Sequence, residues 1–151
     1  MLIKEILVPT DFSKSSDLAV AYAYDVARRY GARLHLLHVI YDIEKSAGWY
    51  MSQIDTGALY DEMHKRAQEE IDRQARDLLG GCDSCEGVIL RGIPYEEILS
   101  FARDRAIDLI VIGTHGRTGI DRVLFGSTAA KVVRYAHMAV LIVREPGPTP
   151  E

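Results

Sequence analysis

Short apolar runs alternate with amphipathic segments along this chain of 151 residues. The runs have the continuous apolar character of strands that are covered on both faces, and the segments between them repeat apolar residues every three or four positions, as helices do. Such strict alternation predicts an α/β fold with a mostly parallel sheet, right-handed crossovers and helices on both faces. The predicted strands are residues 6–8, 33–39, 86–90, 108–112 and 139–143.

Four predicted helices separate these strands. Ser13 opens the first helix, Gly31 ends it as a C-cap, Gly80 and Gly81 end the second, and Pro94 begins the third. The positions expected to face the sheet are Ala19, Tyr22, Ala23, Val26, Ala27 and Tyr30 in the first helix; Leu59, Met63, Ala67, Ile71, Ala75 and Leu78 in the second; Ile98, Leu99 and Ala102 in the third; and Ala129, Val132, Val133 and Ala136 in the last.

Residues 40–56 show neither period and contain Gly48, Trp49 and Tyr50. We therefore expect a long excursion between the second strand and the second helix. Connections of this length are uncommon and often act as lids or contact surfaces.

The composition is that of one globular domain, with 48% hydrophobic and 26% charged residues. We expect it to span residues 1–145 and to be followed by a disordered, proline-rich tail at 146–151. The net charge of −4 does not indicate binding to DNA or RNA. No apolar run approaches the roughly 18 residues that a membrane span needs. A cytoplasmic protein with no nucleic-acid or membrane partner is expected.

The cysteines, Cys82 and Cys85, form a CxxC pattern. The sequence has no second CxxC or HxxxH to complete a zinc site, and this pair follows a helix rather than opening one after a strand, as redox pairs do. A plain turn is the preferred interpretation, with an incidental or regulatory disulfide or a metal site as alternatives.

The fourth predicted strand runs directly into a glycine-rich loop. Gly113, Gly116 and Gly126 have the spacing G-x2-G-x9-G, and Ser127 and Thr128 then begin the last helix. Glycines allow backbone N–H groups to approach a ligand closely, and a helix N-terminus attracts anions. The pattern predicts a phosphate site but is neither a Walker A motif nor a dinucleotide fingerprint. A flexible connection whose glycines serve only turn geometry is the alternative.

Asp11 follows the first strand, where a carboxylate can hold a ribose diol or cap a turn beside Ser13. Ligands of open α/β sheets bind outside the carboxyl ends of the strands, so Asp11 and Gly113 mark the expected rim. His115 and Arg117 lie in the glycine loop and either bind phosphate or remain solvated. His35 and His38 point to opposite faces of one strand and make a poor metal pair.

Together these segments resemble the universal stress protein family. The resemblance covers almost the whole chain and rests on residues 113–119, Gly126-Ser127, residues 131–134, the opening residues 6–13 and the closing strand 139–143. It implies a single five-stranded parallel sheet in the order 3-2-1-4-5 and a homodimer through the last strand, Ala139–Val143. The spacing G-x2-G-x9-G-[ST] marks the family's ATP-binding branch, and the chain satisfies it.

The same resemblance implies an ATP site with a divalent ion, Mg or Mn, nearby. Asp11 would hold the ribose, the Val39 backbone the adenine, and Ser127 and Thr128 the phosphates. Many relatives have valine where Thr128 stands, so this hydroxyl either adds a phosphate contact or caps the helix. The full set of candidate nucleotide-binding residues is Pro9, Thr10, Asp11, Val39, Gly113, His115, Gly116, Arg117, Gly126, Ser127 and Thr128.

The predicted function is a nucleotide-responsive regulatory module in stress response. Phosphate hydrolysis usually needs a positioned lysine, an acidic metal ligand and a residue that orients water, and only Asp11 and the loop arginines are candidates here. Any ATP hydrolysis should therefore be slow, and no catalytic residue is assigned. The alternatives are a nucleotide-free interaction protein that uses residues 40–56 and an adenylyl-transferring enzyme. Residues 9–13 lack the H-x-G-H or S-G-G-x-D pattern that the latter would need.

Overall fold

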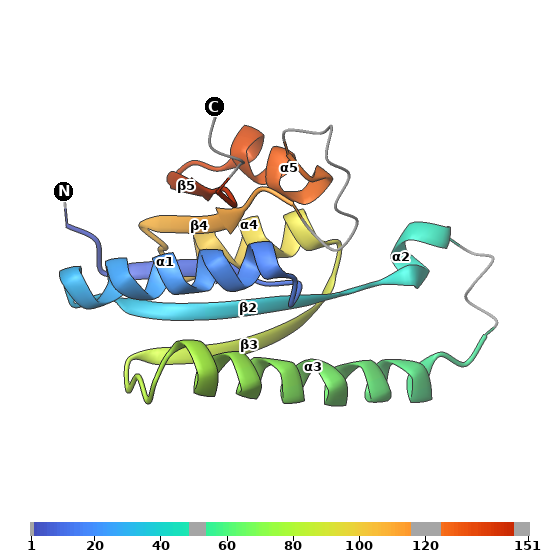
Figure 1. Cartoon of the computed structure of the whole chain (residues 1–151). Coiled ribbons are helices and arrows are strands. Elements are labelled where there is room, and N and C mark those ends of the chain that lie inside the picture. Colours follow the sequence, from blue (N-terminus) through green and yellow to red (C-terminus); the bar gives the residue numbers. More distant parts are fainter. Residues whose placement is uncertain (1, 49–53, 116–124, 147–151) are drawn as a thin grey trace, which may run out of the picture.

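A computed structural model describes residues 2–48, 54–115 and 125–146. One parallel sheet organises the molecule, with its strands in the order β3-β2-β1-β4-β5 (Figure 1). This confirms the predicted α/β class and the order 3-2-1-4-5. The strands are β1 (Glu5–Pro9), β2 (Arg33–Tyr41), β3 (Cys85–Gly92), β4 (Leu109–Gly113) and β5 (Ala139–Val143), and the helices are α1 (Lys14–Tyr30), α2 (Ile43–Ala47), α3 (Gly57–Leu78), α4 (Pro94–Asp104) and α5 (Ser127–Tyr135).

The helices cover both faces of the sheet. Ile6 and Val8 of β1 pack in a core cluster with buried apolar residues of α1 and with Ile71 of α3. Leu7 points the other way, into the cluster formed with α4 and α5. Successive strand residues alternate between faces, so each central strand supplies both cores, which explains its continuous apolar run. None of the described helices is long and apolar enough to cross a membrane.

Local signals set the ends of α1 as predicted. The Ser13 side chain accepts a hydrogen bond from the Ser16 N–H and caps the helix start. Gly31 ends the helix in the left-handed conformation, with φ of 65°. Because β1, β3 and β4 each lead into a helix N-terminus, the carboxyl edge of the sheet gathers the starts of α1, α4 and α5.

Several of the positions that we expected to face the sheet do not do so. Tyr22 and Tyr30 of α1, Leu59 of α3 and Val133 of α5 are exposed. The buried residues of α3 include the predicted Ala67 and Ile71, together with Tyr60 and Gln74, which were not predicted. Periodicity gives the direction of an apolar stripe on a helix but not its width. Small residues such as Ala19 and Ala23 let α1 lie close to the sheet without a contribution from Tyr22 or Tyr30.

The expected excursion at 40–56 is wrong over much of its length. Ile40 and Tyr41 complete β2, and Asp42 caps the short helix α2, its carboxylate accepting from the Lys45 N–H at 3.1 Å. The described part of the chain therefore contains one helix more than predicted. Residues 49–53 lie outside the described residues, as does the tail from residue 147 onward.

Cys82 and Cys85 form a disulfide, so the preferred interpretation as a plain turn is wrong. The bond closes the turn between α3 and β3, in which Gly80 and Gly81 both have positive φ. Ser84 lies inside this turn and its carbonyl accepts the Leu34 N–H of β2 at 2.9 Å. The disulfide thus fixes the start of the edge strand β3. The described residues contain no group of three His, Cys, Asp or Glu side chains that could hold a metal ion.

Candidate functional site

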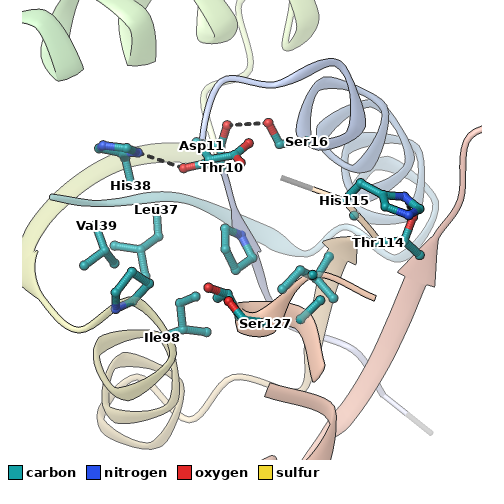
Figure 2. Close-up of a pocket in the computed structure, with 17 residues that line it drawn as sticks. Thr10, Asp11, Ser16, Leu37, His38, Val39, Ile98, Thr114, His115 and Ser127 are labelled. Carbon is teal, nitrogen blue, oxygen red and sulfur yellow. Dashed lines mark hydrogen bonds between the residues drawn. The ribbon is translucent and has the colours of Figure 1, made fainter. Parts of the chain in front are cut away.

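A pocket of about 270 Å³ opens at the carboxyl edge of the sheet, between the ends of β1, β2 and β4 and the starts of α4 and α5 (Figure 2). This is the rim that the sequence predicts. The residues that line the pocket are Pro9, Thr10, Asp11, Ser16, Leu37, His38, Val39, Pro94, Ile98, Ile112, Gly113, Thr114, His115, Gly126, Ser127, Thr128 and Ala129.

Nine of the eleven candidate site residues line this pocket: Pro9, Thr10, Asp11, Val39, Gly113, His115, Gly126, Ser127 and Thr128. The other two, Gly116 and Arg117, lie outside the described residues.

The pocket has an apolar part and a polar part. Leu37, Val39 and Ile98 group on one side, and Thr114 and His115 lie across from them (Figure 2). The start of α5 at Ser127 lies between the two groups. An apolar wall beside a rim of hydroxyl and backbone N–H groups suits a ligand with a flat aromatic portion and an anionic portion.

Asp11 belongs to the turn that joins β1 to α1. Its Oδ1 accepts the Ser13 N–H at 3.0 Å, which is the turn role considered for it. The preceding residue, Thr10, is buried; its N–H donates to the Leu37 carbonyl at 2.8 Å, and its hydroxyl oxygen accepts the Phe12 N–H at 3.1 Å. The half-buried Asp11 carboxylate is therefore held at the pocket by a turn with fixed backbone.

The end of β4 approaches α1 very closely at Gly113. A Cβ atom on this residue would lie 2.6 Å from the Ser15 hydroxyl oxygen and 2.8 Å from the Ser15 carbonyl oxygen, so only glycine fits without a backbone shift. The Ser15 hydroxyl also accepts the His115 N–H at 3.3 Å. Ser15 thereby fixes the first residues of the glycine loop.

Thr114 joins the two ends of that loop. Its carbonyl accepts the Gly126 N–H at 2.6 Å, and its own N–H donates to the Val143 carbonyl at the end of β5 at 3.2 Å. The hydroxyl of Thr114, whose residue is 1% exposed, lies 2.9 Å from His115 Nδ1. The start of α5 is thus positioned directly beside the end of β4.

The N-terminus of α5 is suited to an anion. Gly126 occupies the N-cap position, and no side chain makes a capping hydrogen bond there. No acidic residue occupies the first turn either, so the positive end of the helix dipole is not offset within the helix. Ser127 and Thr128, the first residues of the helix, both line the pocket.

Charged groups outside the pocket hold the start of α2 against β3 and α3. Arg91 of β3 donates from Nε to Asp42 Oδ2 at 3.1 Å, and its guanidinium lies 3.3 Å from the centre of the Tyr60 ring. Burial acts to raise the pKa of Asp42, but hydrogen bonds from the Lys45 N–H and from Arg91 outweigh it and leave that pKa below the usual value. Asp42 is therefore anionic at neutral pH, and the start of α2 stays fixed.

Sequence reasoning missed His38, Ser15, Ser16, Thr114 and Ile98 as residues around the site. His38 was considered only as a metal partner of His35. The two side chains do lie on opposite faces of the sheet, since His35 packs against Phe101 of α4 and His38 against Phe12. The available signal was position, because His38 comes directly before Val39 in the last part of β2.

Residues 2–144 match the Universal stress protein family. The chain belongs to this family. It is 32% identical to universal stress protein MJ0531 of Methanocaldococcus jannaschii over 96% of the chain and 84% of the relative. The solved structure of MJ0577 from the same organism is 28% identical and superimposes with a TM-score of 0.82, covering 98% of this chain and all of that one.

A third relative is a universal stress protein solved in complex with cAMP. It is 25% identical, covers 95% of this chain and 98% of its own, and has a TM-score of 0.65. The family membership predicted from the sequence is confirmed.

Proposed function

We propose that this protein binds ATP at the pocket between β1 and β4, as a member of the family's ATP-binding branch, and acts as a nucleotide-responsive regulatory module of the cytoplasm in stress response. The observation that carries the proposal is the pocket itself. It combines an apolar wall with the N-terminus of α5, which has no side-chain cap. Gly113, at the end of β4, lines the same pocket.

Each part of ATP has a matching part of the pocket. The adenine lies against Leu37, Val39 and Ile98, and the Val39 backbone provides its polar contacts. The phosphates lie at α5, where Ser127 and Thr128 offer hydroxyl and backbone N–H donors. The ribose hydroxyls donate to the Asp11 carboxylate. The relative solved with cAMP supports an adenine nucleotide as the ligand class.

Asp11 is the one carboxylate among the described residues that line the pocket, and those residues include no group of three His, Cys, Asp or Glu side chains that could hold a metal ion. A divalent ion, Mg or Mn, fits best as a companion of the nucleotide, bound mainly by phosphate oxygens and water. When bound, the ion would neutralise phosphate charge.

A substitution at Ser127 tests the phosphate site. Ser127 is exposed and is the first residue of α5, so Ser127→Asp places a negative charge where the helix dipole favours it and the fold is retained. The same charge repels the phosphates. Titration calorimetry on nucleotide-stripped protein should show saturable Mg-ATP binding in the wild type and an affinity lower by roughly tenfold or more in the variant.

Ala130→Asp is the matched control. Ala130 is exposed on the same helix but does not line the pocket, so this variant should bind Mg-ATP within about twofold of the wild type. The proposal would be overturned by a wild-type protein that gives neither heat nor thermal stabilisation with millimolar ATP. Equal weakening by both aspartates would move the phosphate site away from Ser127.

A further inference from the structure

The residues on either side of Asp11 in the chain both contact His38. His38 Nδ1 lies 2.8 Å from the Thr10 carbonyl oxygen (Figure 2). The imidazole also stacks on the Phe12 ring, with centroids 4.4 Å apart and an angle of 28° between the planes. A single side chain of β2 thus holds the backbone before Asp11 and the side chain after it.

The turn at Asp11 needs such support. Phe12 has φ of 65°, a left-handed conformation that bulky residues rarely adopt and that persists only where the surroundings hold it. The Thr10 hydroxyl accepts the Phe12 N–H, and the stacked imidazole covers the Phe12 ring. Without these contacts the chain from Thr10 to Ser13 would relax toward an ordinary backbone conformation, and the Asp11 carboxylate would move with it.

Chemistry fixes the proton on the imidazole. A backbone carbonyl only accepts hydrogen bonds, so His38 Nδ1 must carry the hydrogen that is donated to Thr10. His38 is also the residue before Val39, and both residues line the pocket. Any shift of β2 at the adenine end is therefore passed to the turn that carries the carboxylate.

We propose that His38 is a positioning residue of the nucleotide site, which places the Asp11 carboxylate for the ribose hydroxyls through the Nδ1–H bond to Thr10 and the stack on Phe12. The inference rests on the proposed ATP site. It adds that ribose recognition depends on a side chain that need not touch the nucleotide.

Two variants separate the hydrogen bond from the ring. His38→Phe keeps a ring against Phe12 but has no donor for Thr10. His38→Asn lacks the ring, but its side-chain amide nitrogen is attached to Cγ, as Nδ1 is in histidine. The amide can therefore restore the hydrogen bond to the Thr10 carbonyl. His64 is exposed on α3 and does not line the described pocket, so His64→Phe is the matched control.

The measurement is the ratio of dissociation constants for 2′,3′-dideoxy-ATP and ATP, which isolates the ribose hydroxyls. His38→Phe should weaken ATP by about tenfold and dideoxy-ATP by less than about twofold, so that the ratio falls toward one. His38→Asn should recover most of the ratio, and His64→Phe should leave it unchanged. A purely structural role would weaken both ligands equally.

Nitrogen-15 NMR of the wild-type protein supplies a second readout without nucleotide. The His38 ring should show its proton on Nδ1, and a ring protonated on Nε2 alone would overturn the inference. A wild-type ratio retained in His38→Phe would also overturn it while leaving the ATP site intact. A wild-type protein that does not bind ATP would instead remove the proposed function, and the inference with it.

Discussion

Asp11 serves the fold and the proposed site at the same time. Its Oδ1 accepts the Ser13 N–H at 3.0 Å, which closes the turn into α1, while the carboxylate lines the pocket. The two roles differ in what they need, because the turn needs an oxygen acceptor and the ribose site needs a strong, charged one. Asparagine keeps the oxygen and removes the charge, so it separates them.

We therefore predict that Asp11→Asn folds normally and binds ATP about tenfold more weakly, whereas its affinity for tripolyphosphate changes by less than about twofold. Tripolyphosphate has no ribose diol for the carboxylate to hold. Calorimetry with both ligands on the wild type and the variant measures the difference. If both ligands weaken equally, Asp11 acts on phosphate, on a metal ion or on the fold.

The candidate site shows which residue roles the sequence reveals. Asp11, Gly113 and Ser127 were predicted because strand ends, glycines and helix starts leave marks in the sequence itself. His38 and Ser15 were missed because their roles depend on contacts across the fold: His38 reaches Thr10 from a neighbouring strand, and Ser15 meets His115 from far along the chain. Chain distance hides such partners from any local pattern.

At the scale of elements, the start of β1 is tied to the start of β4 by Asp108. The Asp108 carboxylate accepts the Lys4 N–H at 2.8 Å and the Glu5 N–H at 3.0 Å, and its own N–H donates to the Glu5 carbonyl at 2.9 Å. The hydrogen bonds from the Lys4 N–H, which has the larger effect, and from the Glu5 N–H lower the pKa of Asp108 below its usual value. Burial acts in the opposite direction and is outweighed.

This connection should make stability depend on pH. Because the pKa of Asp108 is lower in the folded protein than in the unfolded chain, its stabilisation is fully present above the unfolded value of about 4 and is lost as pH falls through the folded value. Asp108 is exposed, so solvent screening limits the effect, and Asp108→Asn should lower the free energy of unfolding by roughly 1 kcal/mol at pH 7.

Urea unfolding of the wild type and Asp108→Asn at pH 7 and at pH 3 measures this difference. The gap between the two proteins should narrow at pH 3, because the pH is then below the unfolded value and the unfolded wild-type chain takes up a proton more readily than the folded protein. A gap that is the same at both pH values would show that the carboxylate charge contributes nothing to the connection.

The type of an element could be predicted where the apolar period extends over many residues. It was harder to predict where a single contact determines whether a segment forms a helix. The strands and the four long helices follow from alternation. The short helix α2 depends on its Asp42 cap and on Arg91 from a different strand, neither of which produces a period. Tyr60 is buried rather than Leu59 because its hydroxyl accepts the Ile43 N–H and its ring lies under Arg91. The Cys82–Cys85 bond could not be chosen over a turn by spacing alone.

At the scale of the whole molecule, the two edges of the sheet are β3 and β5. The start of β3 is held by the disulfide turn and by the Ser84 carbonyl. β5 has β4 as its one partner among the described strands, and Leu141 on it is 37% exposed. Every residue of β5 is apolar, and an apolar strand with an open edge tends to pair with another chain.

We predict that the protein is a homodimer in which β5, Ala139–Val143, pairs with β5 of a second copy around a two-fold axis. Such pairing would also connect the dimer to the pocket, since the Val143 carbonyl at the end of β5 accepts the Thr114 N–H. Leu141→Lys places a charge on the exposed side of this edge and should produce monomers, because a desolvated ammonium at the two-fold axis would meet its own copy.

Sedimentation velocity at micromolar concentration measures the assembly, and circular dichroism shows whether each variant is folded. Wild type should sediment as a dimer, and Leu141→Lys as a folded monomer or with lost secondary structure. Tyr30→Lys, which replaces a more exposed aromatic residue on α1, should remain a dimer. A wild-type monomer would contradict the prediction. A Leu141→Lys protein that remains a folded dimer would place the interface on another surface. The hydrogen bond between Val143 and Thr114 would then not connect the dimer interface to the pocket.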